Sequence, residues 1–295
     1  MNLIKPKKLN LNDKIGIIAP AGAVDSDVQA LKAKEFFENL GYKIVFGKNI
    51  FNKKNYLAGT DEEKLEDLHN FFLDPEIKAI FCLRGGYGSI RLINKINYEL
   101  IKNNPKIFAG YSDITALCTM FLKRAGLITY HAPMFQGDFG VDEVSKFTLN
   151  RFLEVITADK KQTLKAEKIY KQGNANGISF GGNLSTIVSL CGLDFIPDED
   201  FIFFTEDINE PTYKIDKMFR QLLNIDKFRK NLKGLILGDF TGIDNKNYLE
   251  DLFKELSLEL NIPILGGFKI THEKDKITVP VGEIATIKDD IFEIN

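Results

Sequence analysis

Apolar and amphipathic segments alternate along the first half of the chain and predict strands and helices in turn. Runs that are apolar almost throughout lie at 14–22, 42–47, 78–88 and 106–113. Stretches with a helical period follow them, at 25–41, 61–72 and 113–126. Apolar strands that alternate with helices are typical of a parallel sheet covered on both faces, so we expect an α/β fold with such a sheet. Within the first helix, Asp25 or Ser26 is the expected cap, Leu31, Lys34 and Phe37 to Leu40 set the expected phase, and Gly41 is expected to end the helix.

The pattern changes after a polar, lysine-rich stretch at about residues 158–177. Beyond it, strand-like runs follow one another with only two clear helical patterns between them, which start near Lys214 and Tyr248. We therefore expect an N-terminal domain over residues 1–160 and a smaller C-terminal domain, α/β or mostly β, over residues 161–295. The stretch at 158–177 is the expected linker.

Composition excludes several classes of function. The chain has 295 residues and a net charge of −2, so it lacks the basic field that nucleic acid or an anionic membrane requires. No apolar run approaches the ~18 residues that cross a bilayer, and the N-terminus lacks a signal-peptide pattern, so we expect a cytoplasmic protein. Cys82, Cys118 and Cys191 form no metal-binding spacing, and we expect neither a metal nor another cofactor.

A serine at the end of an expected strand is the first candidate nucleophile. Ser112 follows an apolar run and precedes a helical pattern, which places it beyond the carboxyl end of a strand, where parallel sheets bind ligands. Free backbone N–H groups at a helix start also favour negative charge there. Serine is equally a favoured helix N-cap, and the local sequence alone favours the cap. The G-x-S-x-G pattern of α/β-hydrolases is not met, because Ile114 replaces the second glycine.

Two further segments end apolar runs with groups that suit chemistry. The glycines of "RGGYG", at 84–88, fit an oxyanion hole, a phosphate cradle or simply a tight turn, and they match neither a P-loop nor a dinucleotide fingerprint. Glu206 and Asp207 follow four apolar residues, where a carboxylate needs a partner such as an imidazole, a base or a metal. An internal salt bridge, or a cap for the helix near Lys214, explains these acids equally well.

The chain has only three histidines, so any catalytic imidazole is one of them. His69 lies in a highly charged helical pattern and is expected at the surface. His131 follows an apolar run and fits either a base or a hydrogen-bonded core residue. His272 lies in a polar loop after a Gly-Gly turn. From the residues alone, His131 and His272 are equal candidates for the base that activates Ser112.

Eight motifs in one order resemble a known family. They are "IGIIAPAG", "FCLRGGYGSIRLI", "FAGYSDITAL", "YHAPM", "GISFGGNLSTIVSLCG", "FFTEDINEPTYKIDKMFRQL", "LKGLILGDF" and "TVPVGEIATI". The set resembles the LD-carboxypeptidases, or muramoyltetrapeptide carboxypeptidases, which are serine peptidases. One branch of that family confers immunity to microcin-type peptide-nucleotides. Each motif alone is weak, but eight in order, from about residue 15 to 287, are specific.

The resemblance implies a catalytic triad of Ser112, Glu206 and His272. It also implies an oxyanion hole made by the backbone N–H groups of Gly86 and Asp113. The family fold is a Rossmann-like N-terminal domain and a smaller C-terminal domain of β and α, with the active site between them and usually a homodimer. The implied substrate is a murein tetrapeptide or a related small peptide, which loses its terminal D-Ala during peptidoglycan recycling in the cytoplasm.

The sequence departs from the family pattern in two places. Thr271-His272-Glu273-Lys274 stands where members commonly have a Gly-His pair, which raises a question about the shape of that loop. Ala132 stands where glycine is usual. Two other hypotheses remain: a microcin-immunity-type peptidase that cleaves aminoacyl-nucleotide conjugates and needs an aromatic ring to stack the base, and a non-catalytic nucleotide-binding module that holds phosphate with "RGGYG".

Overall fold

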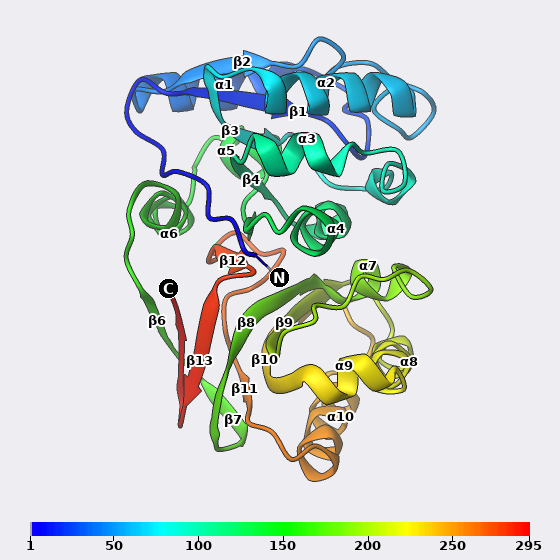
Figure 1. Cartoon of the computed structure of the whole chain (residues 1–295). Helices are drawn as coiled ribbons and strands as arrows, with labels where there is room; N and C mark the ends of the chain where they lie inside the picture. Colours follow the sequence, from blue (N-terminus) through cyan, green and yellow to red (C-terminus); the bar gives the residue numbers. More distant parts are fainter. Residues whose placement is uncertain (1) are drawn as a thin grey trace.

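The computed structural model describes residues 2–295, in which the strands form two sheets stacked one above the other (Figure 1). The first sheet has six strands in the order β12-β5-β4-β3-β1-β2, and the second has eight in the order β6-β14-β13-β8-β9-β10-β11-β7. The predicted fold class, a parallel-sheet α/β unit with a second α/β unit, is confirmed.

The first sheet is parallel from β1 to β5, as the apolar runs predict. Its edge strand β12 comes from the far end of the chain and pairs antiparallel with β5. The strands of this sheet are β1 (Lys14–Ile18), β2 (Lys43–Phe46), β3 (Ile77–Cys82), β4 (Ile107–Gly110), β5 (Thr129–His131) and β12 (Val279–Val281).

Helices cover both faces of the first sheet, because the side chains of its buried strands alternate between two apolar clusters. In β3, Phe81 packs against Phe37 and Phe152 on one face, while Ile80 joins the cluster of Phe108 on the other face. One face carries α1 (Val28–Asn39), α5 (Phe135–Phe139) and α6 (Lys146–Thr157), and the other carries α2 (Asp61–Leu73), α3 (Tyr98–Asn103) and α4 (Thr115–Ala125).

The ends of α1 show where local prediction holds and where it fails. Gly41 follows the helix with a φ of 94°, and its left-handed backbone ends α1 as expected. The hydroxyl of Ser26 accepts a hydrogen bond from the N–H of Val28, although the N-cap residue is Asp27. The expected phase holds at Phe37, which is buried, and is wrong at Leu31, which is exposed, because the helix turns Ala30 and Ala33 toward the sheet together with Phe37.

The second sheet is parallel through β8, β9, β10 and β11 and has antiparallel strands at both sides. Its strands are β6 (Gln162–Lys165), β7 (Lys168–Lys171), β8 (Asn174–Asn183), β9 (Phe201–Ile208), β10 (Leu232–Thr241), β11 (Ile264–Gly266), β13 (Ile284–Lys288) and β14 (Ile291–Ile294). Its helices are α7 (Leu184–Ser189), α8 (Thr212–Leu223), α9 (Asp226–Asn231) and α10 (Lys246–Glu259).

The stretch at 158–177 contains ordered strands. It holds β6 and β7 and the start of β8, and β6 and β7 form opposite edges of the second sheet. The later strand β12 lies in the first sheet. Strand β12 of the second half of the chain thus belongs to the sheet of the first half. The division of the chain into two domains near residue 160 stays a prediction.

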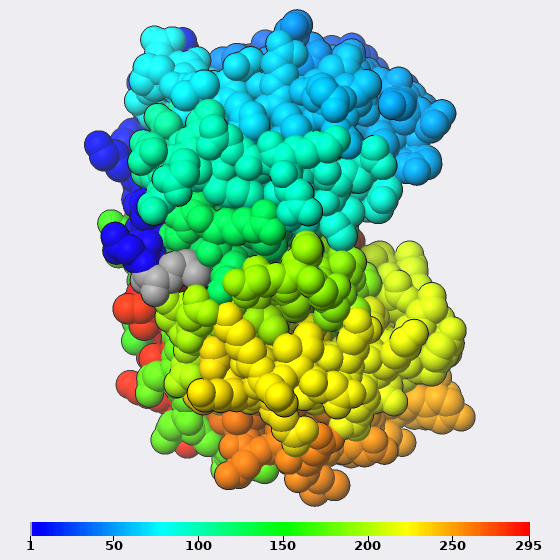
Figure 2. Space-filling view, turned by 45° about the vertical axis from the view of Figure 1, so that its right-hand side comes forward, coloured from blue at the N-terminus to red at the C-terminus, as the bar shows by residue number. Residues whose placement is uncertain are grey.

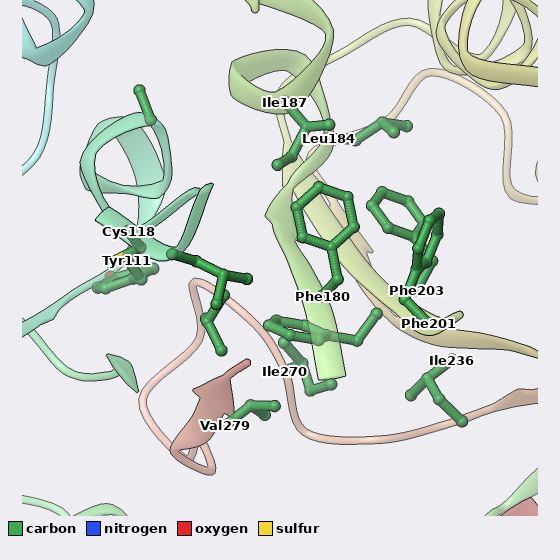
Figure 3. Packing of buried hydrophobic residues seen from close by; sticks show 14 of the residues in the cluster. Tyr111, Cys118, Phe180, Leu184, Ile187, Phe201, Phe203, Ile236, Ile270 and Val279 are labelled. Atoms are coloured by element: carbon green, nitrogen blue, oxygen red, sulfur yellow. The ribbon is translucent and has the colours of Figure 1, made fainter. Parts of the chain in front are cut away.

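Helix α4 lies between the two sheets and packs against both β4 and the pair β8–α7. Figure 3 shows Tyr111 and Cys118 on one side of this contact, with Phe180, Leu184 and Ile187 on the other. All belong to one apolar cluster that runs through both layers. Figure 2 shows the result from outside: the first half of the chain and the second half form two lobes of one continuous surface.

Candidate active site

Ser112 lies in a strained turn between β4 and α4. It begins a 3₁₀ turn (η2, Ser112–Ile114) and has a φ of 57°, which is unfavourable for a residue with a side chain. Its hydroxyl caps nothing: α4 begins at Thr115, its N-cap residue is Ile114, and no side chain caps it. The helix-cap explanation of Ser112 is therefore wrong. A strained serine at the carboxyl end of a parallel strand points to a functional role.

A glycine turn lies directly against this serine. A Cβ atom on Gly85 would lie 3.2 Å from Ser112 Cβ and 3.3 Å from Ser112 Oγ, so a side chain there would crowd the hydroxyl. Gly86 has a φ of 107°, a conformation that glycine adopts freely. The carboxylate of Asp113 accepts a hydrogen bond from the N–H of Ser89 at 2.9 Å and ties the glycine turn to the serine turn. Burial raises the pKa of Asp113.

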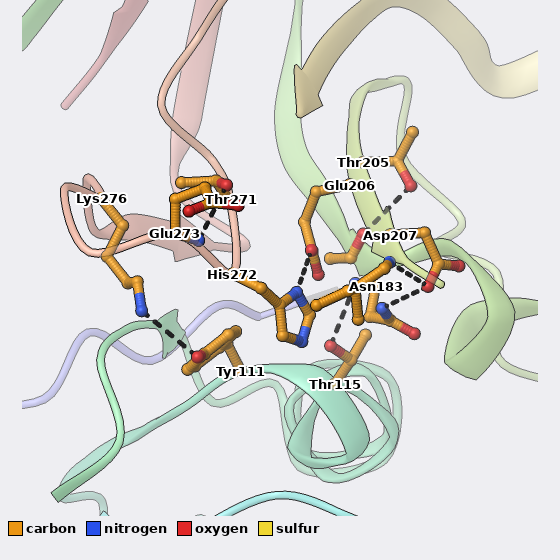
Figure 4. A network of polar contacts seen from close by, with 12 residues as sticks. Tyr111, Thr115, Asn183, Thr205, Glu206, Asp207, Thr271, His272, Glu273 and Lys276 are labelled. Atoms are coloured by element: carbon orange, nitrogen blue, oxygen red, sulfur yellow. Dashed lines mark hydrogen bonds and ion pairs between the residues drawn. The ribbon is translucent and has the colours of Figure 1, made fainter. Parts of the chain in front are cut away.

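Glu206 and His272 form a hydrogen-bonded pair. Nδ1 of His272 lies 2.6 Å from Oε2 of Glu206 (Figure 4). Glu206 is fully buried near the end of β9, and its Oε1 has no hydrogen-bond partner among the described residues. The structure thus brings the acid predicted from "FFTEDI" onto the predicted histidine, 66 positions away.

The neighbouring acid has a structural part instead. Asp207 accepts hydrogen bonds from Asn183 Nδ2 at 2.9 Å and from the N–H of Ser185 at 2.8 Å, at the start of α7. The N–H of Asn183 in turn donates to Thr115 Oγ1 at 3.2 Å, which links the end of β8 to α4 (Figure 4). These bonds hold the ends of β8 and β9 against the helix that follows the serine. The helix near Lys214 is not capped by either predicted acid.

The loop that carries His272 is held by α6. Ser145 Oγ donates to Asp275 Oδ1 at 2.6 Å, and Thr148 Oγ1 donates to the carbonyl of Lys274 at 2.8 Å and accepts from the N–H of Lys276 at 2.9 Å. These contacts answer the question that the unusual Thr-His-Glu-Lys sequence raises, because the loop is anchored by its polar residues rather than by glycines.

A buried lysine completes that anchoring. Nζ of Lys276 forms an ion pair with Asp138 on α5 and donates to the hydroxyl of Tyr111 at 3.2 Å (Figure 4). The Tyr111 ring lies between this amine and His272, with its centroid 4.8 Å from the imidazole centroid. Burial raises the pKa of Tyr111, so its hydroxyl stays protonated and neutral. Neither Lys276 nor Asp138 carried a sequence signal that could have revealed this contact.

Neither of the other two histidines lines the cavity of Ser112 or hydrogen-bonds to Glu206. His131 is buried in β5, packs against Tyr111 and Phe204, and has a pKa lowered to about 4 by burial. His69 is half-buried on α2 and accepts a hydrogen bond from the N–H of Asn97, so the expectation of a surface residue holds only in part.

Ser112 and His272 line one cavity of about 380 Å³, together with Gly85, Gly86 and Arg84. Within residues 2–295, no hydrogen bond joins the serine hydroxyl to the imidazole. Such contacts are often long before substrate binds. Arg84 was not predicted as a site residue. Its position directly before the glycines of "RGGYG" is the sequence signal that could have indicated it. The described residues contain no group of three or more His, Cys, Asp or Glu side chains placed to hold a metal ion.

Comparison with known proteins agrees with this architecture. Residues 15–132 match the model of the LD-carboxypeptidase N-terminal domain, and residues 176–287 match that of the LD-carboxypeptidase C-terminal domain. The chain is 37% identical to a Bacillus subtilis protein named "Probable murein peptide carboxypeptidase", over 96% of this chain and 91% of that protein.

Two further relatives represent the other branch. The chain is 27% identical to the microcin C7 self-immunity protein MccF of Escherichia coli, over 93% of this chain and 90% of that protein. The crystal structure of an MccF-like protein from Bacillus anthracis superposes with a TM-score of 0.91 at 27% identity, covering 99% of each chain. Two matched domains and relatives of nearly equal length lead to one conclusion: the chain belongs to the LD-carboxypeptidase family.

Proposed function

We propose that this protein is a serine carboxypeptidase that removes the terminal D-Ala from murein tetrapeptides. The observation that carries the proposal is the buried Glu206–His272 pair at 2.6 Å, with His272 on the wall of the same cavity as the strained Ser112. Members of its family act as peptidases, and the relative from B. subtilis is named for murein peptides.

In the proposed mechanism, the Glu206 carboxylate accepts a hydrogen bond from the N–H at Nδ1 of His272, which leaves Nε2 unprotonated as the base. Nε2 takes the proton of the Ser112 hydroxyl while Oγ attacks the carbonyl carbon of the scissile amide. Glu206 then stabilises the imidazolium that has formed. The Glu206 carboxylate holds the imidazole without taking its proton.

The negative charge that develops on the carbonyl oxygen needs donors. The backbone N–H groups of Gly86 and Asp113 are the proposed donors. In other enzymes, one such donor stabilises the transition state by about 3–4 kcal/mol. The side-chain contact between Asp113 and Ser89 supports this part, because it holds the two turns together. His272 next gives its proton to the leaving amine, and D-Ala departs. A water molecule, activated by the same imidazole, then hydrolyses the ester on Ser112.

We further propose that the protein acts in the cytoplasm as a homodimer and serves peptidoglycan recycling. Among the described residues, no helix combines the length and the apolar character needed to cross a bilayer. In the proposed substrate, the scissile bond joins the L-centre of a diamino acid residue to the terminal D-Ala, so the diamino acid is the acyl group that Ser112 receives.

The test is mass spectrometry of a murein tetrapeptide after incubation with the protein. The proposal expects loss of one alanine and release of D-Ala, unchanged by EDTA. Activity that is lost on chelation and restored by Zn²⁺ would instead indicate a metallopeptidase. An unchanged tetrapeptide at micromolar enzyme over hours would contradict the proposal.

A second candidate function is cleavage of aminoacyl-nucleotide conjugates. An adjoining cavity of about 420 Å³, which shares Arg84 and Gly86 with the first, is lined by Tyr56 and Tyr87. Both tyrosines are exposed, their ring centroids lie 5.8 Å apart, and exposed aromatic rings can stack a nucleobase. This function predicts faster hydrolysis of an aminoacyl sulfamoyl adenosine than of the tetrapeptide, and a loss of that preference in Tyr87→Ala.

A further inference from the structure

The guanidinium of Arg84 is fixed next to the proposed oxyanion site. Nη1 donates a hydrogen bond to the carbonyl of Ala23 at 2.7 Å, which anchors one corner of the group. The opposite edge, formed by Nε and Nη2, faces glycines. A Cβ on Gly22 would lie 3.6 Å from Nε, and a Cβ on Gly86 would lie 3.9 Å from Nη2. Arg84 therefore reaches the glycine turn that lies against Ser112.

Arg84 has no carboxylate partner in residues 2–295. Most other arginines of the chain form ion pairs: Arg91 with Asp61, Arg151 with Glu154, Arg220 with Asp216, and Arg229 with Glu259. Arg84 is half-buried, so its guanidinium loses part of its hydration, and within the described residues only Nη1 gains a hydrogen bond in return, to the carbonyl of Ala23. An unpaired arginine on the wall of a cavity is suited to an anionic ligand.

The charged side chains around the cavity differ in whether they already have a partner. Arg84 is the one lysine or arginine among the described residues that line the cavity of Ser112. A second cavity of about 500 Å³ shares His272 with the first, and its acids Asp138, Asp142 and Glu143 are each paired with a lysine, namely Lys276, Lys32 and Lys274. A carboxylate of the substrate therefore finds its unpaired positive partner at Arg84.

A carboxypeptidase must recognise one group that an endopeptidase ignores, the free carboxylate one residue beyond the scissile bond. The planar guanidinium of arginine can bind such a carboxylate through two parallel hydrogen bonds. We propose that Arg84 binds the terminal carboxylate of the departing amino acid and thereby makes the enzyme an exopeptidase. This inference rests on the proposed function, and it assigns a binding role to Arg84, with the proton transfers left to His272.

The test compares two substrates, the murein tetrapeptide with a free C-terminus and the same peptide as its C-terminal amide. Both contain the scissile bond, and they differ by the negative charge. In the wild type, kcat/KM should be about 100-fold higher for the free acid, the order expected of a charge-assisted pair. Arg84→Met should lower kcat/KM for the acid about 100-fold and leave the amide within about threefold. Arg84→Lys should fall between the two.

Lys53 offers a matched control. It lines the adjoining cavity with Arg84, but it is exposed and already paired with Asp25 at 2.7 Å. Lys53→Met removes the same formal charge from the same face of the protein and should leave the preference for the acid unchanged. If Lys53→Met reduces the preference as much as Arg84→Met, a diffuse field and not a contact is responsible, and the proposal is overturned.

A binding measurement separates this proposal from the proposed catalytic function. Calorimetry on Ser112→Ala should show the acid binding at least tenfold more tightly than the amide, with the difference lost when Arg84→Met is added. That result supports the role of Arg84 even if the wild type cleaves neither peptide, in which case only the proposed function fails. An acid preference that persists without Arg84, or an equal loss of kcat/KM for both substrates in Arg84→Met, overturns the proposal while the function stands.

Discussion

Replacing Glu206 with glutamine tests the hydrogen bond that orients the proposed base. Glutamine keeps the shape and volume of the side chain and removes its charge. In the structure, Oε2 of Glu206 lies 2.6 Å from Nδ1 of His272, the side chain is fully buried, and its Oε1 has no hydrogen-bond partner among the described residues. The charge of Glu206 therefore acts mainly on this imidazole.

The expected loss follows from the charge that the imidazole gains during attack. A carboxylate and an imidazolium about 4 Å apart attract by about 4 kcal/mol at an effective dielectric constant of 20. Loss of that attraction in the transition state slows the reaction about 10³-fold. The amide of glutamine can also donate to Nδ1, which would put the hydrogen on Nε2 and block its action as a base on Ser112. We expect kcat of Glu206→Gln to fall about 10³–10⁴-fold.

The assay is release of D-Ala from murein tetrapeptide, with thermal unfolding measured on the same samples. Asp207→Asn is the matched control, because Asp207 is the adjacent buried carboxylate and contacts Asn183 and Ser185 rather than His272. Its kcat should stay within about tenfold of the wild type. A folded Glu206→Gln protein that keeps more than a tenth of kcat would refute the role given to Glu206.

Three further predictions test the surroundings of the site. Lys276→Met should lower the free energy of unfolding by about 3–5 kcal/mol, because it leaves Asp138 without its buried partner; adding Asp138→Asn should restore part of the loss in urea titrations. In His131→Phe, turnover should persist, and the free energy of unfolding should depend less on pH between 6.5 and 4. The folded pKa of His131 is about 4, so as pH falls the unfolded state binds the proton first. The wild type therefore loses about 3 kcal/mol of stability across that window. Gly85→Ala should reduce kcat/KM about 10–100-fold with little change in the melting temperature, since its Cβ would lie 3.3 Å from Ser112 Oγ; full activity would show that the hydroxyl tolerates crowding.

Sequence patterns predicted the elements that are long and periodic. The parallel strands β1 to β4 and the helices α2 and α4 lie where the apolar runs and the helical patterns place them. The capping box that Thr60 and Glu63 form at the start of α2 was not predicted. Short elements were not predicted. Helices α7 and α9 have only six residues each, which is too short for a helical period of apolar residues to be detected. The strands β6 and β7 were not predicted either, because edge strands at the surface are polar and resemble a linker in sequence.

The residues of the site also divide into those that the sequence indicated and those that it did not. Strand ends indicated Ser112, the glycine turn and Glu206 as separate candidates. Ser112 and the glycine turn follow β4 and β3 of the first sheet, whereas Glu206 lies near the end of β9 in the second, so only the family resemblance joined them into one predicted site. The contact between Lys276 and Asp138 could not be read from the chain, since it joins a loop to a helix 138 residues away. Burial of His131 likewise depended on packing between the two layers, which local sequence does not encode.

The most direct test of the triad is D-Ala release from murein tetrapeptide by the wild type, Ser112→Ala and His272→Ala. We expect release by the wild type and a loss of at least about 10³-fold in each variant, with melting temperatures close to the wild-type value, because members of a triad act as a unit. A folded Ser112→Ala protein that releases D-Ala at more than a tenth of the wild-type rate would contradict the account.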